Sequence, residues 1–178
     1  MKRLLVVVFL VTCSALALAA DRIYTNPNPA DALRKLFPDA AMFSSLEGTP
    51  LHFTAYREDV KKNPNAQVLG YAFWVTDLSP KEFGYHGPIH TLVGMDLAGI
   101  LRGVVVDFDS EPYGYFSVET PQFAAQFKGK SIRDRFMVGV DVDAISRATI
   151  STTSATRGIR DASRAMARAF LSPDAVKK

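Results

Sequence analysis

The pattern of residues 157–170 constrains the fold most, because it specifies a long amphipathic helix near the end of the chain. Apolar side chains recur there at helical spacing, and arginines occupy the opposite face. The apolar face holds Ile159, Ala162, Met166, Ala169 and Phe170, and the other face holds Arg157, Arg160, Arg164 and Arg168. We expect the arginine face to be solvated, and it would also suit an acidic partner. Gly158 lies inside this helix, at a cost of roughly 1 kcal/mol relative to Ala.

The stretch before this helix is dominated by β-strand patterns. Residues 51–57 alternate between apolar and polar, and residues 68–76 are rich in aromatic and β-branched side chains. Residues 89–97 and 100–107 flank a tight turn at Ala98-Gly99, which predicts a hairpin. Because residues 104–106 are three consecutive valines, we expect this hairpin at the centre of the sheet, with its second strand buried on both faces.

Short helices are predicted on either side of these strands. One covers residues 31–36, and another runs from the Thr120-Pro121 pair, a cap followed by proline, to about Gly129. Residues 136–142 are expected as a last strand or turn. No linker divides the chain, so we predict one α+β fold: a mostly antiparallel sheet with a central hairpin, flanked by helices and ending in the amphipathic helix.

The N-terminus is typical of a secretory signal. Lys2 and Arg3 precede a continuous apolar stretch, and small residues end it before Asp21. We expect cleavage after residue 20; the alternative is a retained anchor, since residues 4–20 are at the lower limit of a membrane span. The predicted divisions are a signal peptide at 1–20, an N-terminal extension at 21–66, the main domain at 67–172 and a tail at 173–178. The expected location is periplasmic.

Charge and cysteine content narrow the functional classes. Cleavage would remove two of 21 basic residues, leaving 19 against 18 acidic ones and a net charge of +1, so nucleic-acid binding is not indicated. The single cysteine, Cys13, lies in the signal, which leaves no thiol for a disulfide or metal. His86 and His90 are four positions apart, but Gly87 and Pro88 between them prevent a shared helical face, so we predict no metal site. Residues 124–131 fit a loose phosphate-loop pattern but are predicted helical, which excludes that interpretation.

Residues 143–149, Asp-Ala-Ile-Ser-Arg-Ala-Thr, lie just before the expected start of the last helix at about residues 151–153. A helix N-terminus offers free N–H groups and a positive dipole to a phosphate. Ser and Thr are also common there as simple helix caps, so that explanation stays open. The segment resembles the flavin-attachment motif of FMN-binding domains such as the RnfG and NqrC subunits and the NosR/NirI-type regulators. That motif is Asp, two residues, Ser or Thr, then Gly-Ala-Thr, with FMN on the final Thr.

Mapped onto this chain, the resemblance implies a cofactor site at Asp143, Ser146, Arg147, Ala148 and Thr149, with FMN joined to the Thr149 hydroxyl as a phosphodiester. Arg147 stands where the family has Gly. Arg147 is also close to the expected phosphate, and Arg157 or Arg160 would approach that phosphate if the first turn of the helix faces it. Ser154-Ala155-Thr156 is a second, weaker candidate inside the predicted helix. The family's motif thus specifies Thr149 as the acceptor.

Other segments resemble the same family in the same order. Residues 84–89, Gly-Tyr-His-Gly-Pro-Ile, resemble the segment that leads into its hairpin, and residues 110–114 resemble its flavin-facing loop, which adds Glu111, Pro112 and Gly114 to the expected site. Glu111 would hydrogen-bond the flavin or close a turn. Tyr113, Tyr115 and Phe116 would stack on the flavin or fold onto the core. The resemblance extends over residues 67–170.

The resemblance implies a periplasmic electron carrier, closest to the NosR-type flavin domain, rather than an enzyme with its own substrate. A flavin transferase would attach FMN, and a redox partner in the periplasm or membrane would exchange electrons with it. Membrane contact is expected only through that partner or an uncleaved signal. Two alternatives stay open: a NosR-like accessory or maturation factor for an anaerobic respiratory reductase, and a binding module that has lost the flavin because of Arg147.

Overall fold

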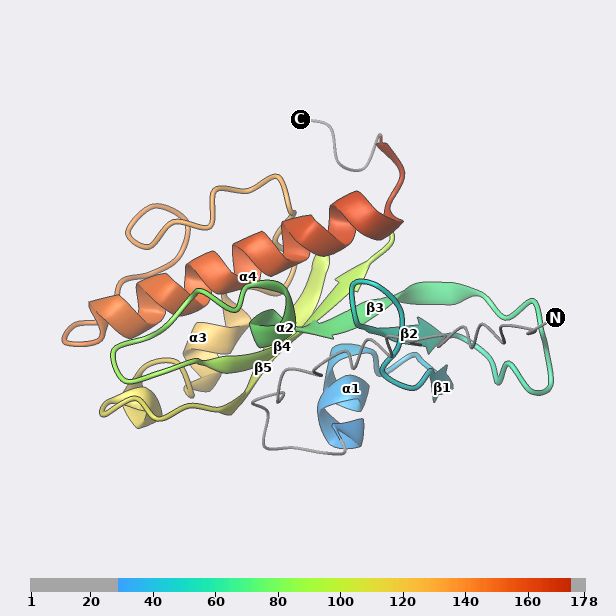
Figure 1. Cartoon of the computed structure of the whole chain (residues 1–178), viewed down its shortest axis with the longest axis horizontal. Helices are drawn as coiled ribbons and strands as arrows, with labels where there is room; N and C mark the ends of the chain where they lie inside the picture. The colour runs from blue at the N-terminus through green and yellow to red at the C-terminus, as the bar shows by residue number, and fades with distance from the viewer. Residues whose placement is uncertain (1–28, 174–178) are drawn as a thin grey trace, which may run out of the picture.

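The computed structural model describes residues 29–173, so the predicted signal peptide and most of the tail lie outside the described residues. Five antiparallel strands form one sheet in the order β1-β2-β3-β4-β5. The strands are β1 (Met42–Phe43), β2 (Phe53–Tyr56), β3 (Val68–Trp74), β4 (His90–Asp96) and β5 (Leu101–Phe108). With helices on both faces, this architecture confirms the predicted α+β class (Figure 1).

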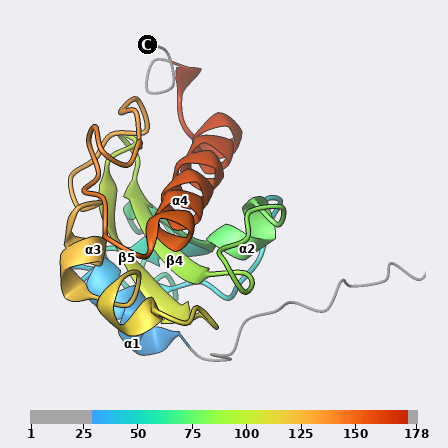
Figure 2. The same cartoon turned by 90° about the vertical axis from the view of Figure 1, so that its left-hand side faces the viewer.

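Each face of the sheet carries its own apolar core. Alternation along β4 separates them, because Val93 and Met95 point into one core and Leu92 into the other. Helix α4 (Thr149–Phe170) covers the first face, and α1 (Ala30–Leu36) covers the second. Figures 1 and 2 show the sheet between these two helices. The fold therefore has three layers: α4, the sheet and α1.

The predicted hairpin forms, but β5 is the outer strand of the sheet instead of a central one. At the turn, Ala98 N–H and Ile100 N–H both donate to the Asp96 Oδ1 at 2.9 Å. The outer edge of β5 is met by a loop: Leu101 N–H donates to the Lys130 carbonyl, and Gly129 N–H donates to the Leu101 carbonyl, each at 2.8 Å. This loop therefore covers the start of the β5 edge, and Val105 and Val106 farther along are only half-buried, so the strand is not buried on both faces as predicted.

The shorter elements follow the sequence closely. Helix α3 (Pro121–Ala125) starts where predicted, with the Phe123 N–H donating to the Thr120 hydroxyl at 3.2 Å, although it ends four residues before Gly129. The predicted strand at 68–76 stops at Trp74, where α2 (Val75–Leu78) begins. A 3-10 turn covers Gly114–Phe116. Residues 136–142 form a turn held by one bridge between Val138 and Val142.

Helix α4 begins at Thr149, two residues earlier than expected, and its packing corrects two details. Ala169, predicted on the buried face, is exposed. The arginine face is not simply solvated, because three of its members have partners. Arg157 pairs with Glu82 at 3.2 Å, Arg160 pairs with Asp161 at 2.7 Å, and Arg164 donates to two carbonyl groups, those of residues 132 and 134.

Gly158 is required by a close approach between two helices. An added Cβ would lie 2.8 Å from Val75 Cγ1 of α2. The cost of a mid-helix glycine is therefore offset by the packing of α4 against α2. Among the described residues, no helix has the length and hydrophobicity that crossing a membrane requires.

Candidate functional site

A surface pocket of about 390 Å³ opens at the N-terminal end of α4. Its size falls within the roughly 300–1,000 Å³ of small-molecule sites. Three segments distant in sequence build its wall: the loop before β4, the loop after β5 and the start of α4. The residues that line it are Tyr85, Pro112, Tyr113, Arg147, Ala148, Thr149, Ile150 and Ser151. The pocket thus brings the predicted attachment motif together with part of the predicted flavin-facing loop.

Thr149 is the first residue of α4, and its side chain is exposed on the pocket wall. The N-cap position belongs to Ala148, and no side chain caps this helix end. Thr149 therefore does not serve as the N-cap, which was the ordinary structural explanation for a Thr at this point. Thr149 lines a cavity at the positive end of a 22-residue helix.

Arg147 adopts a left-handed backbone conformation, with φ of +67°. Few non-glycine residues tolerate this region, and glycine adopts it freely. The family motif has Gly at this position, so this chain keeps the backbone geometry that glycine favours while carrying an arginine side chain. The side chain is exposed and contributes to the pocket wall.

Glu111 is buried beneath the pocket and connects its three segments. One carboxylate oxygen accepts from Tyr85 N–H at 2.8 Å and the other from His86 N–H at 2.9 Å. The Ser151 hydroxyl donates to the same carboxylate from the first turns of α4. Gly84 packs so closely that an added Cβ would lie 2.4 Å from the carboxylate. From the sequence, Glu111 was expected to hydrogen-bond the flavin or to close a turn; its side chain instead joins three distant segments, a role that the sequence did not predict.

These donors keep Glu111 charged. Burial by itself would raise the pKa of Glu111, but the hydrogen bonds from the Ser151 hydroxyl and from the N–H groups of His86, Tyr85 and Gly87 outweigh burial. The pKa of Glu111 therefore lies below its usual value. A buried carboxylate saturated with donors holds the pocket wall in one arrangement.

Gly114 does not line the pocket, and two carboxyl groups press against it instead. An added Cβ would lie 2.4 Å from Asp109 Oδ1 and 2.5 Å from Glu119 Oε1. Burial raises the pKa of Asp109, and the charge of Glu111 adds to this effect. Burial and Asp109 together raise the pKa of Glu119. Asp109 Oδ1 also accepts the Glu111 N–H at 2.9 Å, so this carboxyl pair supports the loop that forms the wall.

The aromatic residues divide between the pocket and its surroundings. Tyr85 and Tyr113 line the pocket and are 63% and 48% exposed. Tyr115 is 72% exposed outside the pocket lining, and its ring meets that of Phe116 edge-on at 5.0 Å. Phe116 also contacts Tyr113 at 5.3 Å between ring centroids. Two tyrosines are therefore placed to contact a planar ligand, while Phe116 supports one of them.

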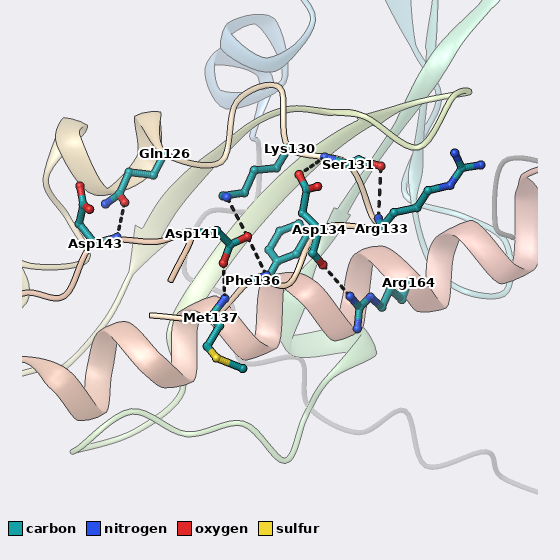
Figure 3. A network of polar contacts seen from close by, with 10 residues as sticks. All are labelled: Gln126, Lys130, Ser131, Arg133, Asp134, Phe136, Met137, Asp141, Asp143 and Arg164. Atoms are coloured by element: carbon teal, nitrogen blue, oxygen red, sulfur yellow. Dashed lines mark hydrogen bonds and ion pairs between the residues drawn. The ribbon is translucent and has the colours of Figure 1, made fainter. Parts of the chain in front are cut away.

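The first half of the predicted motif lies outside the pocket. Asp143 and Ser146 are exposed and do not line it, and Asp143 N–H donates to the Gln126 side chain at 2.6 Å. Just before them, the Asp141 carboxylate accepts from Lys130 Nζ at 3.1 Å and from the N–H groups of Phe136 and Met137 (Figure 3). This network fixes the approach of the chain to α4.

Sequence reasoning did not single out three lining residues as site residues: Tyr85, Ile150 and Ser151. Tyr85 lies in the family-like 84–89 segment, which was a usable signal. Ile150 and Ser151 follow Thr149 directly. Because the helix was expected to begin later, these two residues were not predicted to lie beside Thr149 at the helix start. The alternative candidate Thr156 is buried inside α4, where its hydroxyl donates to the Thr152 carbonyl at 2.6 Å. Within residues 29–173, no three His, Cys, Asp or Glu side chains cluster as metal ligands.

Comparison with known proteins identifies a family match in the C-terminal half of the chain. Residues 84–164 match the FMN-binding domain family, and this range contains every residue that lines the pocket. A curated relative is a component of the Na⁺-translocating ferredoxin:NAD⁺ oxidoreductase complex of Acetobacterium woodii. It is 23% identical over 146 residues, covering 72% of this chain and 69% of the relative.

Proposed function

Residues 84–164 belong to the FMN-binding domain family, and from this premise we propose that the protein is an exported electron carrier with FMN esterified to Thr149. The observation that carries the proposal is the position of Thr149. Its exposed side chain lies on the wall of the pocket, at the uncapped N-terminus of a 22-residue helix.

The residues of the pocket suit the parts of FMN. Tyr85, Pro112 and Tyr113 offer apolar and aromatic surface to the isoalloxazine ring. The first turn of α4 has no side-chain cap, so its N–H groups and dipole favour a phosphate on Thr149. When bound, FMN would supply one- and two-electron chemistry, and the protein would control its orientation and access.

Attachment requires a flavin donor whose phosphorus is already activated, such as flavin adenine dinucleotide. A bond would form between Thr149 Oγ1 and the phosphorus of the FMN half, and the pyrophosphate bond of the donor would break. Adenosine monophosphate would leave, and the hydroxyl proton would pass to a base on the flavin transferase. Thr149 is exposed, as a separate enzyme acting on its hydroxyl requires.

The redox role and location extend the proposal. The relative is a component of an oxidoreductase complex, which supports a redox partner protein for this chain. The charged start, apolar stretch and small residues of 1–20 support export to the periplasm. A covalent link suits export, because a dissociating cofactor would be lost outside the cytoplasm.

The test is co-production with a flavin transferase, followed by acid precipitation. Flavin absorbance should stay with the denatured wild-type protein and disappear in Thr149→Val. Ser45→Ala is the control, because Ser45 is an exposed hydroxyl outside both the motif and the pocket lining and should keep the flavin. The bound flavin should also bleach reversibly on reduction. Covalent flavin in Thr149→Val, or a colourless wild type, would contradict the proposal.

A further inference from the structure

Arg147 is the charged residue in the wall of the pocket, and within residues 29–173 it forms no ion pair. The other arginines that the sequence placed near the phosphate are engaged. Arg157 pairs with Glu82, and Arg160 pairs with Asp161. Arg147 is therefore the cation available to a ligand in this pocket.

The backbone at Arg147 makes the side chain informative. A φ of +67° costs an L-residue roughly 1–2 kcal/mol, and glycine would avoid that cost. Strained backbone conformations cluster at functional sites, so the strain at Arg147 in a pocket wall indicates a function for its guanidinium group.

The electrostatic surroundings favour an anion beside Arg147. The residue lies two positions before Thr149, at the positive and uncapped end of α4. The Glu111 carboxylate beneath the pocket is buried and already accepts hydrogen bonds from Ser151, Tyr85 and His86. These donors hold the carboxylate in place, and neither it nor any other described carboxylate forms an ion pair with Arg147, so Arg147 remains free to meet a charge in the pocket.

We propose that Arg147 recognises the phosphate of the flavin, so that the pocket holds a flavin phosphate, free or esterified to Thr149, more tightly than it holds riboflavin. This inference rests on the proposed flavin site and assigns its specificity. A guanidinium forms paired, charge-assisted hydrogen bonds with a phosphate, which riboflavin lacks. The strained backbone at Arg147 would thus lower the stability of the protein, while its side chain would provide selectivity for the flavin phosphate.

The experiment uses the wild-type protein produced without a flavin transferase. FMN and riboflavin are titrated separately, with quenching of flavin fluorescence as the signal. FMN should bind about 10- to 100-fold more tightly than riboflavin, as expected for hydrogen bonds to a charged group. Arg147→Gln should remove this preference by weakening FMN alone, and raised salt should reduce it in the wild type.

Two further variants separate binding from folding. Arg147→Gly also removes the charge but relieves the backbone, so it should lose FMN selectivity while the protein becomes more stable. Arg168→Gln is the control, because Arg168 is exposed in the last turn of α4, at the far end from Thr149, and should keep the selectivity.

The possible outcomes distinguish the phosphate role of Arg147 from the flavin site proposed above. Selectivity lost in both Arg147 variants and kept in Arg168→Gln would support the phosphate role. Both flavins binding equally to wild type, or selectivity surviving in Arg147→Gln, would overturn the inference while the flavin pocket stands. If neither flavin binds, the inference is overturned, while covalent attachment, which starts from the activated donor on the transferase, is decided by its own test with Thr149→Val.

Discussion

The Ser151 hydroxyl donates a hydrogen bond to the buried Glu111 carboxylate, and this contact joins α4 to the loop after β5. The same carboxylate accepts N–H groups of Tyr85 and His86 from the loop before β4. One side chain therefore fixes the relative positions of all three segments that build the pocket. The geometry of the candidate flavin site depends on this internal contact.

Glu111→Gln should destabilise the protein and loosen the pocket. The amide keeps one acceptor but turns an NH₂ group toward donors, leaving buried N–H or O–H groups unpaired at a cost of about 1–3 kcal/mol. Urea unfolding at pH 7 measures this loss. Asp143→Asn is the control, since that exposed carboxylate should change stability by less than about 0.5 kcal/mol. Equal effects of the two variants would contradict the role assigned to Glu111.

The effect of Glu111→Gln should also depend on pH. The folded-state pKa of Glu111 is lowered, so its stabilisation is complete above its unfolded-state pKa, near 4, and disappears as the pH falls through the lower folded-state value. The difference in unfolding free energy between wild type and variant should therefore be largest at neutral pH and shrink in acid. A difference that grows in acid would contradict the lowered pKa.

Asp109→Asn should have the opposite sign. Burial and the neighbouring charge of Glu111 raise the folded-state pKa of Asp109, so the ionised carboxylate costs stability at pH 7, and this cost fades as the pH falls toward 4 and below. The variant should therefore melt at a higher temperature than wild type at pH 7, and the gain should vanish in acid. A loss of stability at pH 7 would show that Asp109 is a net stabilising anion.

Arg147→Gly should stabilise the protein by about 1 kcal/mol, because glycine adopts positive φ without a steric cost. Arg147→Ala is the matched control. It removes the same side chain but keeps Cβ, so it should not reproduce the gain. Chemical denaturation of both variants measures the difference, and similar stability for the two would argue against backbone strain at this position.

Gly158→Ala should destabilise the protein by about 1–3 kcal/mol, although alanine is the better helix former. The new Cβ would lie 2.8 Å from Val75 Cγ1, so α4 and α2 would have to separate. Val75→Ala in the same chain should recover part of the loss by making room. If Gly158→Ala alone raises the melting temperature, the close packing of these helices is not as described.

Local patterns predicted the elements whose causes are local. The spacing of Ile159, Ala162 and Met166 specified the buried face of α4, and Thr120-Pro121 marked the start of α3. The position of β5 in the sheet was not predictable in this way, because the start of its outer edge pairs with residues 129–132, about 30 positions along the chain. Pairing at that distance leaves no periodic signal in either segment.

The same distinction between local and long-range causes applies to the residues of the candidate site. Thr149 and Arg147 were identified from a contiguous motif, and both line the pocket. The internal role of Glu111 was not predicted, because its partners Tyr85 and Ser151 lie 26 and 40 positions away in sequence. The positive φ of Arg147 likewise follows from how the chain enters α4, not from the identity of an arginine.

The most direct test is the intact mass of the exported wild-type protein after co-production with a flavin transferase. We expect a chain that begins at Asp21 and carries the added mass of one esterified FMN. The tryptic peptide of residues 148–157 contains several Ser and Thr residues, so fragment ions must place the modification on Thr149. A correctly processed chain without added mass, or with FMN on another hydroxyl, would contradict the central claim.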